Sequence, residues 1–167
     1  MSDFQFSQKW IASLTENARQ SSRFRQHCNI HKSYDDPCQF LFNAIEANSY
    51  IHPHRHSLDP KVEYLVAIRG YFALVTFFDD GNIQYIDHFG SEAYQNDQRV
   101  GFGVVVPPEI WHTVIALAPD SVLIEAKSGP FSINTAKELA QWAPKDGSDE
   151  ATFFLLELKS KVLSSTA

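Results

Sequence analysis

Between residues 39 and 127 the sequence consists of short apolar runs separated by turn signals, and this pattern restricts the fold more than any other feature. The runs are rich in β-branched and aromatic residues, which predicts about eight strands. They cover residues 39–45, 49–56, 62–69, 71–78, 83–88, 100–106, 111–117 and 122–127. Asp79-Asp80-Gly81-Asn82 is a strong hairpin turn between two of them. Because no helices alternate with the strands to cross over a parallel sheet, we expect an all-β core, most economically a double-sheet jelly-roll barrel.

Both ends of the chain carry helical signals. Near the N-terminus apolar residues recur at helical spacing, at Trp10, Ile11, Leu14 and Ala18. This predicts an amphipathic helix from Ser7 to about Gln20 that packs on the outside of the barrel. Beyond the last strand we expect a helical turn over residues 136–142 and a terminal helix over residues 151–163 that lies on the barrel.

The length of 167 residues and the 44% hydrophobic content provide for one sizeable core, so the chain is read as one domain. Residues 1–38 form the N-terminal helix and a polar connector that pack on the barrel. Residues 39–130 form the barrel, and residues 131–167 form a C-terminal extension.

The net charge of the chain limits the classes of molecule that it is expected to bind. A formal net charge of −6 without any run of lysines or arginines argues against nucleic acid, so a small molecule is the expected ligand. The first six residues lack the features of a secretory signal, and no stretch approaches the roughly eighteen apolar residues of a membrane span. The sequence therefore predicts a soluble, cytoplasmic protein without membrane contacts, in which Cys28 and Cys38 are free thiols.

The segment from Tyr50 to His56 holds the main candidate site. In an extended strand alternate side chains share a face, so His52, His54 and His56 point the same way. Imidazole nitrogens with one carboxylate form a ligand set for a divalent first-row metal, whereas calcium and magnesium prefer oxygen. The pattern therefore indicates a transition-metal site.

Two short motifs give this site a family resemblance. Cupins carry G-x5-H-x-H-x3,4-E-x6-G and, later, G-x5-P-x-G-x2-H-x3-N. The chain resembles the first motif at His54, His56, Glu63 and Gly70, and the second at Gly101, Pro107 and His112. By this resemblance the fold is a cupin double-stranded β-helix with an N-terminal helix and a short C-terminal helical segment.

The chain departs from these motifs in three places. Six residues separate His56 from Glu63, which a hairpin loop between the two strands accommodates. The first glycine that the first motif expects is missing near Ser49, and Ala116 replaces the asparagine of the second motif. Glu109 replaces the second motif's second glycine, which puts a charged side chain into a turn near the expected metal.

Beyond the motifs, the chain is similar nearly end to end to the WbuC family of cupin-fold metalloproteins. The matching segments are Ser22-Arg23-Phe24-Arg25 with Asn29 and His31, Asn43-Ala44, Ser49-Tyr50-Ile51, Pro53-His54-Arg55-His56, Trp111-His112-Thr113, residues 125–131 and Trp142-Ala143-Pro144. That family is associated with bacterial surface-polysaccharide gene clusters. The resemblance implies one divalent transition metal ion (Zn, Fe(II), Ni, Mn or Co) held by His54, His56, Glu63 and His112, and a homodimer, as is common among cupins.

Other residues are candidates for roles around the metal. His52 is the alternative to His56 as a ligand if the register is shifted, although the spacing to Glu63 favours His54 and His56. Glu125 and Lys127 share one face of a strand, and they either contact substrate or form an ion pair at the barrel mouth. Arg25, Asn29 and His31 are candidates for a substrate-binding lid, against the alternative of simple solvation. Candidate proton-transfer groups are Glu109, Tyr50 and Lys127, with Tyr50 equally readable as a packed aromatic.

Two functions fit these residues. The first is a metal-dependent enzyme, of isomerase, epimerase-like or oxygenase type, acting on a small sugar-like molecule or a hydroxy or keto acid in O-antigen type polysaccharide metabolism. The second is a non-catalytic module that binds or senses such a ligand through the metal. A metal-free epimerase is disfavoured, because it has no need of four intact metal ligands.

Overall fold

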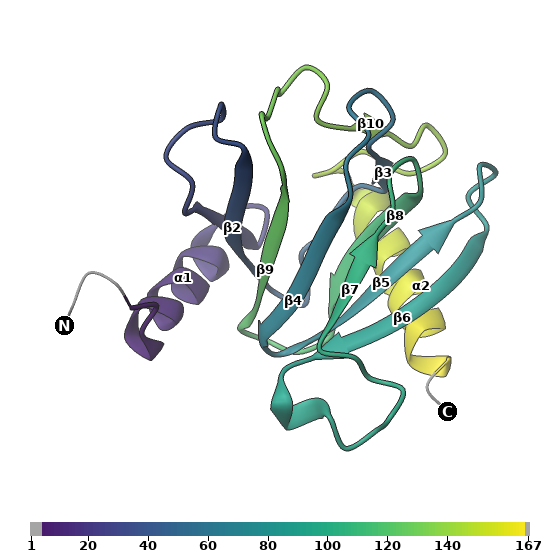
Figure 1. Ribbon diagram of the computed structural model, residues 1–167. Coiled ribbons are helices and arrows are strands. Elements are labelled where there is room, and N and C mark those ends of the chain that lie inside the picture. The colour runs from purple at the N-terminus through teal and green to yellow at the C-terminus, as the bar shows by residue number, and fades with distance from the viewer. Residues whose placement is uncertain (1–4, 166–167) are drawn as a thin grey trace.

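The computed structural model describes residues 5–165 and contains two antiparallel five-stranded sheets that face each other, with one long helix near each end of the chain (Figure 1). The helices are α1 (Gln8–Gln20), α2 (Asp149–Ser164) and the short 3-10 helix η1 (Glu92–Tyr94). The strands are β1 (Arg25–Asn29), β2 (Cys38–Ile45), β3 (His54–Arg55), β4 (Glu63–Arg69), β5 (Tyr71–Phe77), β6 (Ile83–Gly90), β7 (Gly103–Val106), β8 (Trp111–Ala116), β9 (Ser121–Ser128) and β10 (Glu138–Leu139). The predicted jelly-roll barrel with a helix at each end is confirmed.

The first sheet has the strand order β1-β2-β9-β4-β7, and the second has the order β10-β3-β8-β5-β6. Alternate residues of both sheets point between them and form an apolar core. Its buried members are Ile45, Leu65, Ala67, Phe72, Leu74, Phe89, Val106, Val114, Ala116 and Leu123. The apolar packing fills part of the barrel, and the predicted metal ligands lie in the remainder.

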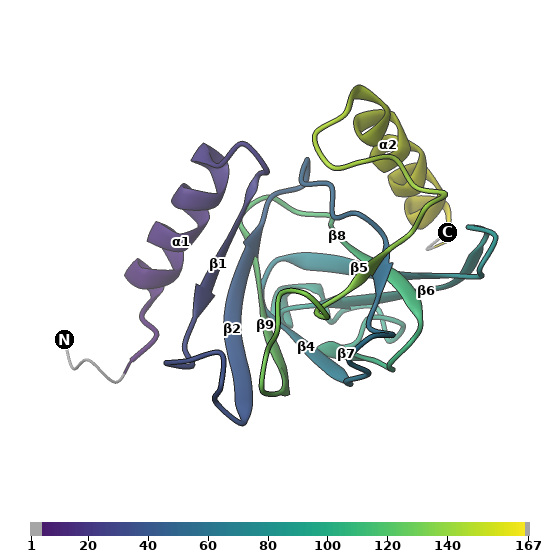
Figure 2. The ribbon, with the colours of Figure 1, turned by 90° about the horizontal axis from the view of Figure 1, so that it is seen from above.

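Each long helix covers the outer face of one sheet (Figure 2). Ile11, Leu14 and Ala18 of α1 pack on β2 and β9, as the apolar spacing predicts. The predicted C-terminal helix forms as α2, which packs on the second sheet through Ala151, Leu155, Leu158 and Val162. Each helix is preceded by a capping serine, Ser7 or Ser148, whose side chain accepts a hydrogen bond from a first-turn backbone N–H.

Three predicted segments differ from the structure. The polar connector contains β1, which pairs with β2 along its whole length and extends the first sheet. The strand predicted over residues 49–56 is reduced to β3, because Pro53 lacks the N–H that a continuous ladder requires. The helical turn predicted over residues 136–142 is wrong, since Glu138 and Leu139 pair with β3 as β10 instead.

The predicted hairpin turn joins β5 and β6. The N–H of Gly81 donates to Phe78, and the N–H of Phe78 donates to Asn82. Gly81 has a φ of +85°, a left-handed conformation that glycine adopts without strain. Both cysteines are free thiols, as predicted.

Residues 1–4 and 166–167 of the predicted terminal segments lie outside the described residues. Within residues 5–165, no helix has the length and hydrophobicity that crossing a bilayer requires.

Candidate metal centre

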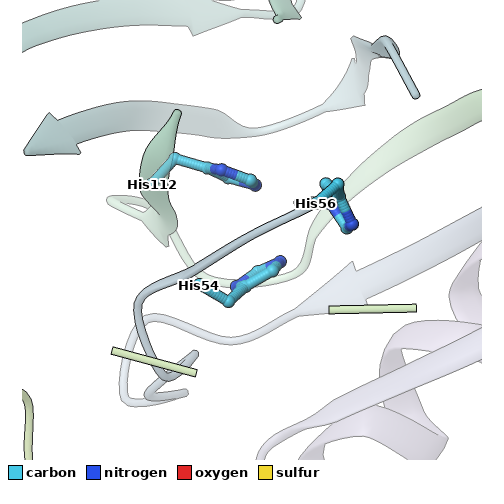
Figure 3. Close-up of side chains that lie close together, drawn as sticks. All are labelled: His54, His56 and His112. Carbon is cyan, nitrogen blue, oxygen red and sulfur yellow. The ribbon is translucent and has the colours of Figure 1, made fainter. Parts of the chain in front are cut away.

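Three histidines converge at one end of the barrel interior (Figure 3). His54 lies on β3 directly opposite His112 of β8, and His56 follows β3. Each of the three offers one ring nitrogen, and these nitrogens lie within 4.8 Å of one another. His56 and His112 are buried and His54 is partly buried. The alternation along the His54-x-His56 segment and the pairing of β3 with β8 therefore bring together three of the four predicted ligands.

Backbone carbonyls orient all three imidazole rings. Nδ1 of His54 lies 2.9 Å from the carbonyl oxygen of His52, and Nδ1 of His112 lies 2.8 Å from that of Ile110. Nδ1 of His56 lies 2.5 Å from the carbonyl oxygen of Ala136. Because a carbonyl oxygen only accepts, Nδ1 carries the proton and Nε2 keeps its lone pair. This is the tautomer that metal-binding histidines use, with the second nitrogen held by a partner.

Glu63 brings a carboxylate from the facing sheet. It begins β4, is 4% exposed, and places Oε2 3.1 Å from Nε2 of His56 and 3.6 Å from Nε2 of His112. Nε2 of His56 is buried and has no partner that meets hydrogen-bond geometry. Lone-pair acceptors held this close to each other, one of them unpartnered, are the arrangement that a cation satisfies.

The pKa shifts at His54 and Glu63 match that arrangement, whereas the shift at His56 favours a proton between His56 and Glu63. Burial and the neighbouring His112 hold the pKa of His54 well below its usual range, so its ring stays neutral. Burial raises the pKa of Glu63, but contacts with His112, His56 and Lys127 outweigh it and hold this pKa well below the usual range. Burial lowers the pKa of His56, and the carboxylate of Glu63 more than compensates, so that the net pKa is raised.

The donor set fits a first-row transition metal. Three imidazole nitrogens and one carboxylate oxygen suit zinc, iron(II), nickel, manganese or cobalt better than calcium or magnesium. His54, His56, His112 and Glu63 would hold such an ion, and the ion would supply Lewis acidity to a bound substrate.

Glu125 and Lys127 form an ion pair, which was one of the two alternatives for them, and both side chains are partly buried. Lys127 lies opposite Glu63 across β4 and β9. Its amine is 2.7 Å from Oε1 of Glu63 and 2.9 Å from Oε1 of Glu125. Burial, and then the charge of Glu63, raises the pKa of Glu125. Both residues therefore face the interior, where Lys127 connects a metal ligand to a second carboxyl group.

The proposed proton-transfer residues Tyr50 and Glu109 lie elsewhere. Tyr50 is buried near Phe154, and its hydroxyl donates to the carbonyl of Pro144 at 2.8 Å, which agrees with the packed-aromatic alternative. Glu109 is exposed with a φ of +67°, the left-handed conformation that the motif's glycine would adopt, and its charge acts on Arg55. Neither placement supports the predicted catalytic role.

The predicted lid residues are placed by different contacts. Arg25 is buried, donates to the carbonyl of Tyr50 at 2.7 Å and pairs with Asp146 at 2.5 Å, so it ties β1 to the C-terminal extension. Nδ1 of His31 lies 3.0 Å from the carbonyl oxygen of Phe40. Asn29 is exposed at the end of β1. A substrate contact by any of these three residues stays a prediction.

His52 does not join the three histidines. Its Nε2 lies 2.9 Å from the carbonyl oxygen of Ala140, and it is absent from the group of converging nitrogens. The proline at position 53 interrupts the strand, so His52 anchors the C-terminal extension instead of pointing to the metal centre.

Sequence reasoning missed a group of contacts that holds β3 in place. We call the contacts of Arg55 and Ser57 with Glu138 the clasp. Arg55 donates twice to Glu138, at 2.8 and 3.2 Å, and its guanidinium lies 4.3 Å from the ring centroid of Trp111. Ser57 also donates to Glu138, at 2.6 Å. Because Arg55 and Glu138 are 83 residues apart in sequence, no local sequence pattern predicts their contact.

Comparisons with known proteins identify the fold. Residues 6–88 match a family described as Domain of unknown function (DUF6016). Among curated proteins, none matches this sequence. The crystal structure of protein SO0799 from Shewanella oneidensis superposes with a TM-score of 0.51 at 13% identity, covering 82% of this chain and 83% of that one. The likeness shows that this chain has a cupin fold.

Two further structures are similar over less of the fold. KdgF from Halomonas sp. has a TM-score of 0.46 at 18% identity, over 66% of this chain and 82% of that chain. Oxalate decarboxylase from Bacillus subtilis has a TM-score of 0.48 at 15% identity, over 69% of this chain. The match spans 27% of the length of that decarboxylase.

Proposed function

We propose that this protein is a metal-dependent cupin enzyme that acts on a small sugar-like molecule or a hydroxy or keto acid. The observation that carries the proposal is the convergence of three Nε2 atoms and one carboxylate inside the barrel. The similarity to the WbuC family supports a role in bacterial surface-polysaccharide metabolism in the cytoplasm. Isomerase, epimerase-like and oxygenase chemistry are all compatible with a centre of this composition.

The residues beside the ligands provide a route for protons. Lys127 contacts both Glu63 and Glu125, and the raised pKa of Glu125 places this carboxyl group closer to neutrality than an ordinary glutamate. A buried pair of carboxyl groups that shares one ammonium can exchange a proton with a substrate held at the metal. Lys127 is the predicted proton-transfer residue that lies at the centre.

One observation favours the alternative of a binding or sensing module. The hydroxyl of Tyr50 is occupied by Pro144, and Glu109 is exposed to solvent, so two predicted catalytic groups are remote from the ligands. A module that only binds needs the metal and polar contacts, without a proton donor.

Elemental analysis of natively expressed protein, followed by turnover assays with candidate sugars and hydroxy or keto acids, tests the proposal. We expect one equivalent of a transition metal, and turnover that disappears in His112→Ala but persists in His88→Ala, a histidine on β6 outside the centre. Undiminished activity after metal stripping would refute a metal-dependent reaction. Tight ligand binding without product would favour the binding module.

We also propose that the chain forms a homodimer through the outer face of β4 and β7. Helix α1 covers the outer face at β2 and β9. Exposed apolar side chains occur on β4 at Tyr64, Val66 and Ile68, on β7 at Val105, and at Phe102 just before β7. A contiguous apolar patch of this kind on a folded domain is typical of a protein interface.

A further inference from the structure

Lys137 lies in the C-terminal extension, and its charged amine is on the side of the metal centre. In the ladder between β3 and β10, Glu138 lies opposite Arg55 and Leu139 lies opposite His54. Because successive residues of a strand alternate faces, Lys137 shares the face of His54 and His56, while the clasp of Arg55 and Glu138 lies on the other face. Among residues 5–165, no carboxylate forms an ion pair with Lys137.

The charge of Lys137 reaches both sheets. Burial, followed by the cations Arg25 and Lys127, lowers the pKa of Lys137, although the residue remains open to solvent. Its charge in turn lowers the pKa of His27 on β1 and of His54 on β3. These charge interactions connect Lys137 with residues of two facing sheets. Arg25 and Lys127 have carboxylate partners, whereas Asp146 and Glu125 act on Lys137 only through their charge and form no ion pair with it in the described part of the chain.

Asn43 presents an unpartnered amide oxygen to the interior face of the first sheet. It lies on β2 between His27 of β1 and Leu123 of β9, and Leu123 belongs to the apolar core between the sheets. Asn43 is 6% exposed, and its Oδ1 is buried without a hydrogen-bond partner. A buried polar atom left unpaired costs about 1–3 kcal/mol, a cost that a bound ligand with polar groups would remove.

A small cavity beside His56 is lined by Asp59, Lys61, Lys127, Ser128, Phe131 and Ala136, and its volume is about 10 Å³. This volume holds roughly one water molecule at most. A ligand larger than water therefore does not fit into this cavity.

We propose that the ligand of the metal centre carries an anionic group, a carboxylate or a phosphate, which Lys137 binds at the barrel mouth beside His27 and Asn43. The inference rests on the proposed metal-dependent function and defines the substrate class of that site. The anion takes the place of the carboxylate partner that Lys137 lacks, while a chelating oxygen group of the same molecule faces the metal.

Two pairs of acids test the proposal on the full chain loaded with Co(II). Lactate and malate share an α-hydroxy acid head and differ in a tail carboxylate, whereas glycerate and 3-phosphoglycerate differ in a tail phosphate. Calorimetry gives each Kd, and the visible spectrum of Co(II) reports whether the head reaches the metal. We expect at least one anionic tail to tighten binding roughly tenfold to hundredfold, the range of a charge-assisted hydrogen bond. The tail that does so distinguishes the carboxylate from the phosphate.

Variants of Lys137 test whether this residue causes the gain in affinity that the anionic tail gives. Lys137→Gln should abolish the tail's advantage, and Lys137→Arg should retain most of it. Lys9→Gln, on the exposed face of α1, is the matched control. The proposal is overturned if neither tail improves binding or if the gain survives Lys137→Gln. Failure of the wild-type chain to take up Co(II) is seen before any acid is added, and it would overturn the metal-dependent function itself.

Discussion

The two carboxylate oxygens of Glu63 have different partners. The amine of Lys127 donates to Oε1 at 2.7 Å, and Oε2 lies 3.1 Å from Nε2 of His56. One ligand oxygen is thereby neutralised and the other is left for the histidines. Glu125 supplies the second carboxylate around the same amine, at 2.9 Å. The three side chains form one buried charge network on β4 and β9.

Removing the ammonium from this network should destabilise the metal-free protein. Lys127→Met leaves Glu63 and Glu125 buried as neighbouring acids, so the free energy of unfolding should fall by about 3 kcal/mol. Urea denaturation with and without Glu125→Gln measures this, and the double variant should recover part of the loss. An unchanged denaturation midpoint in Lys127→Met would contradict the network.

Metal binding should stabilise the fold through the same histidines. A metal present at one hundred times its Kd adds about 2.7 kcal/mol to the free energy of unfolding of the loaded protein. We expect Zn(II) to raise the melting temperature of the wild type and of His88→Ala, and chelation to reverse the shift. His112→Ala should show no shift, and a shift equal to that of the wild type would place the metal elsewhere.

The clasp on β3 should affect metal affinity without touching a ligand. Glu138→Gln weakens the paired hydrogen bonds to Arg55, which hold the two-residue strand that carries His54. Partners that orient metal ligands typically change affinity by about tenfold or more, so the Kd for Zn(II) should rise about tenfold in a competition with a chelating dye. Glu157→Gln, an exposed position on α2 paired with Lys161, is the control and should keep the wild-type Kd.

The titration of His27 should report the charge of Lys137. His27 is exposed on β1, but neighbouring atoms partly desolvate its ring, and this desolvation, followed by Arg25, Arg23, Lys137 and Lys127, lowers its pKa to about 4 from an ordinary 6.5. The unfolded chain therefore binds the extra proton first, and this residue's contribution to stability is lost as pH falls from 6.5 toward 4. An NMR titration should give this low pKa, with the signal assigned by His27→Gln, and Lys137→Gln should raise it. A pKa of His27 that is the same in both proteins would place the amine of Lys137 elsewhere.

The proposed dimer should depend on the apolar face of β4. Val66 is 43% exposed there, so Val66→Lys should shift the mass measured by light scattering from dimer to monomer. Ile133→Lys serves as the control, because Ile133 is 83% exposed in the C-terminal extension. A wild-type chain that is monomeric at all concentrations would rule the dimer out.

Local patterns predicted the long elements well. Apolar spacing over residues 7–20 predicted α1, and short apolar runs bounded by turn signals predicted β4, β5 and β8 within a residue or two. The short elements were missed, because β1 and β10 owe their existence to partners distant in sequence. Arg25 pairs with Ile45, and Glu138 pairs with Arg55. A two-residue strand has too few side chains to carry a periodic signal of its own.

The sequence by itself determined the chemical type of the centre. The spacing of His54 and His56, the carboxylate at Glu63 and a third histidine at position 112 specify nitrogen and oxygen donors for a transition metal. Only the tertiary structure decided which neighbours act on that centre. It removed His52 and Tyr50 from the centre through contacts with Ala140 and Pro144, and it brought Lys137 to the face of the ligating histidines. The physical reason is that ligand identity follows from side-chain chemistry and strand alternation, which are local, whereas access and electrostatics depend on charges brought together by folding.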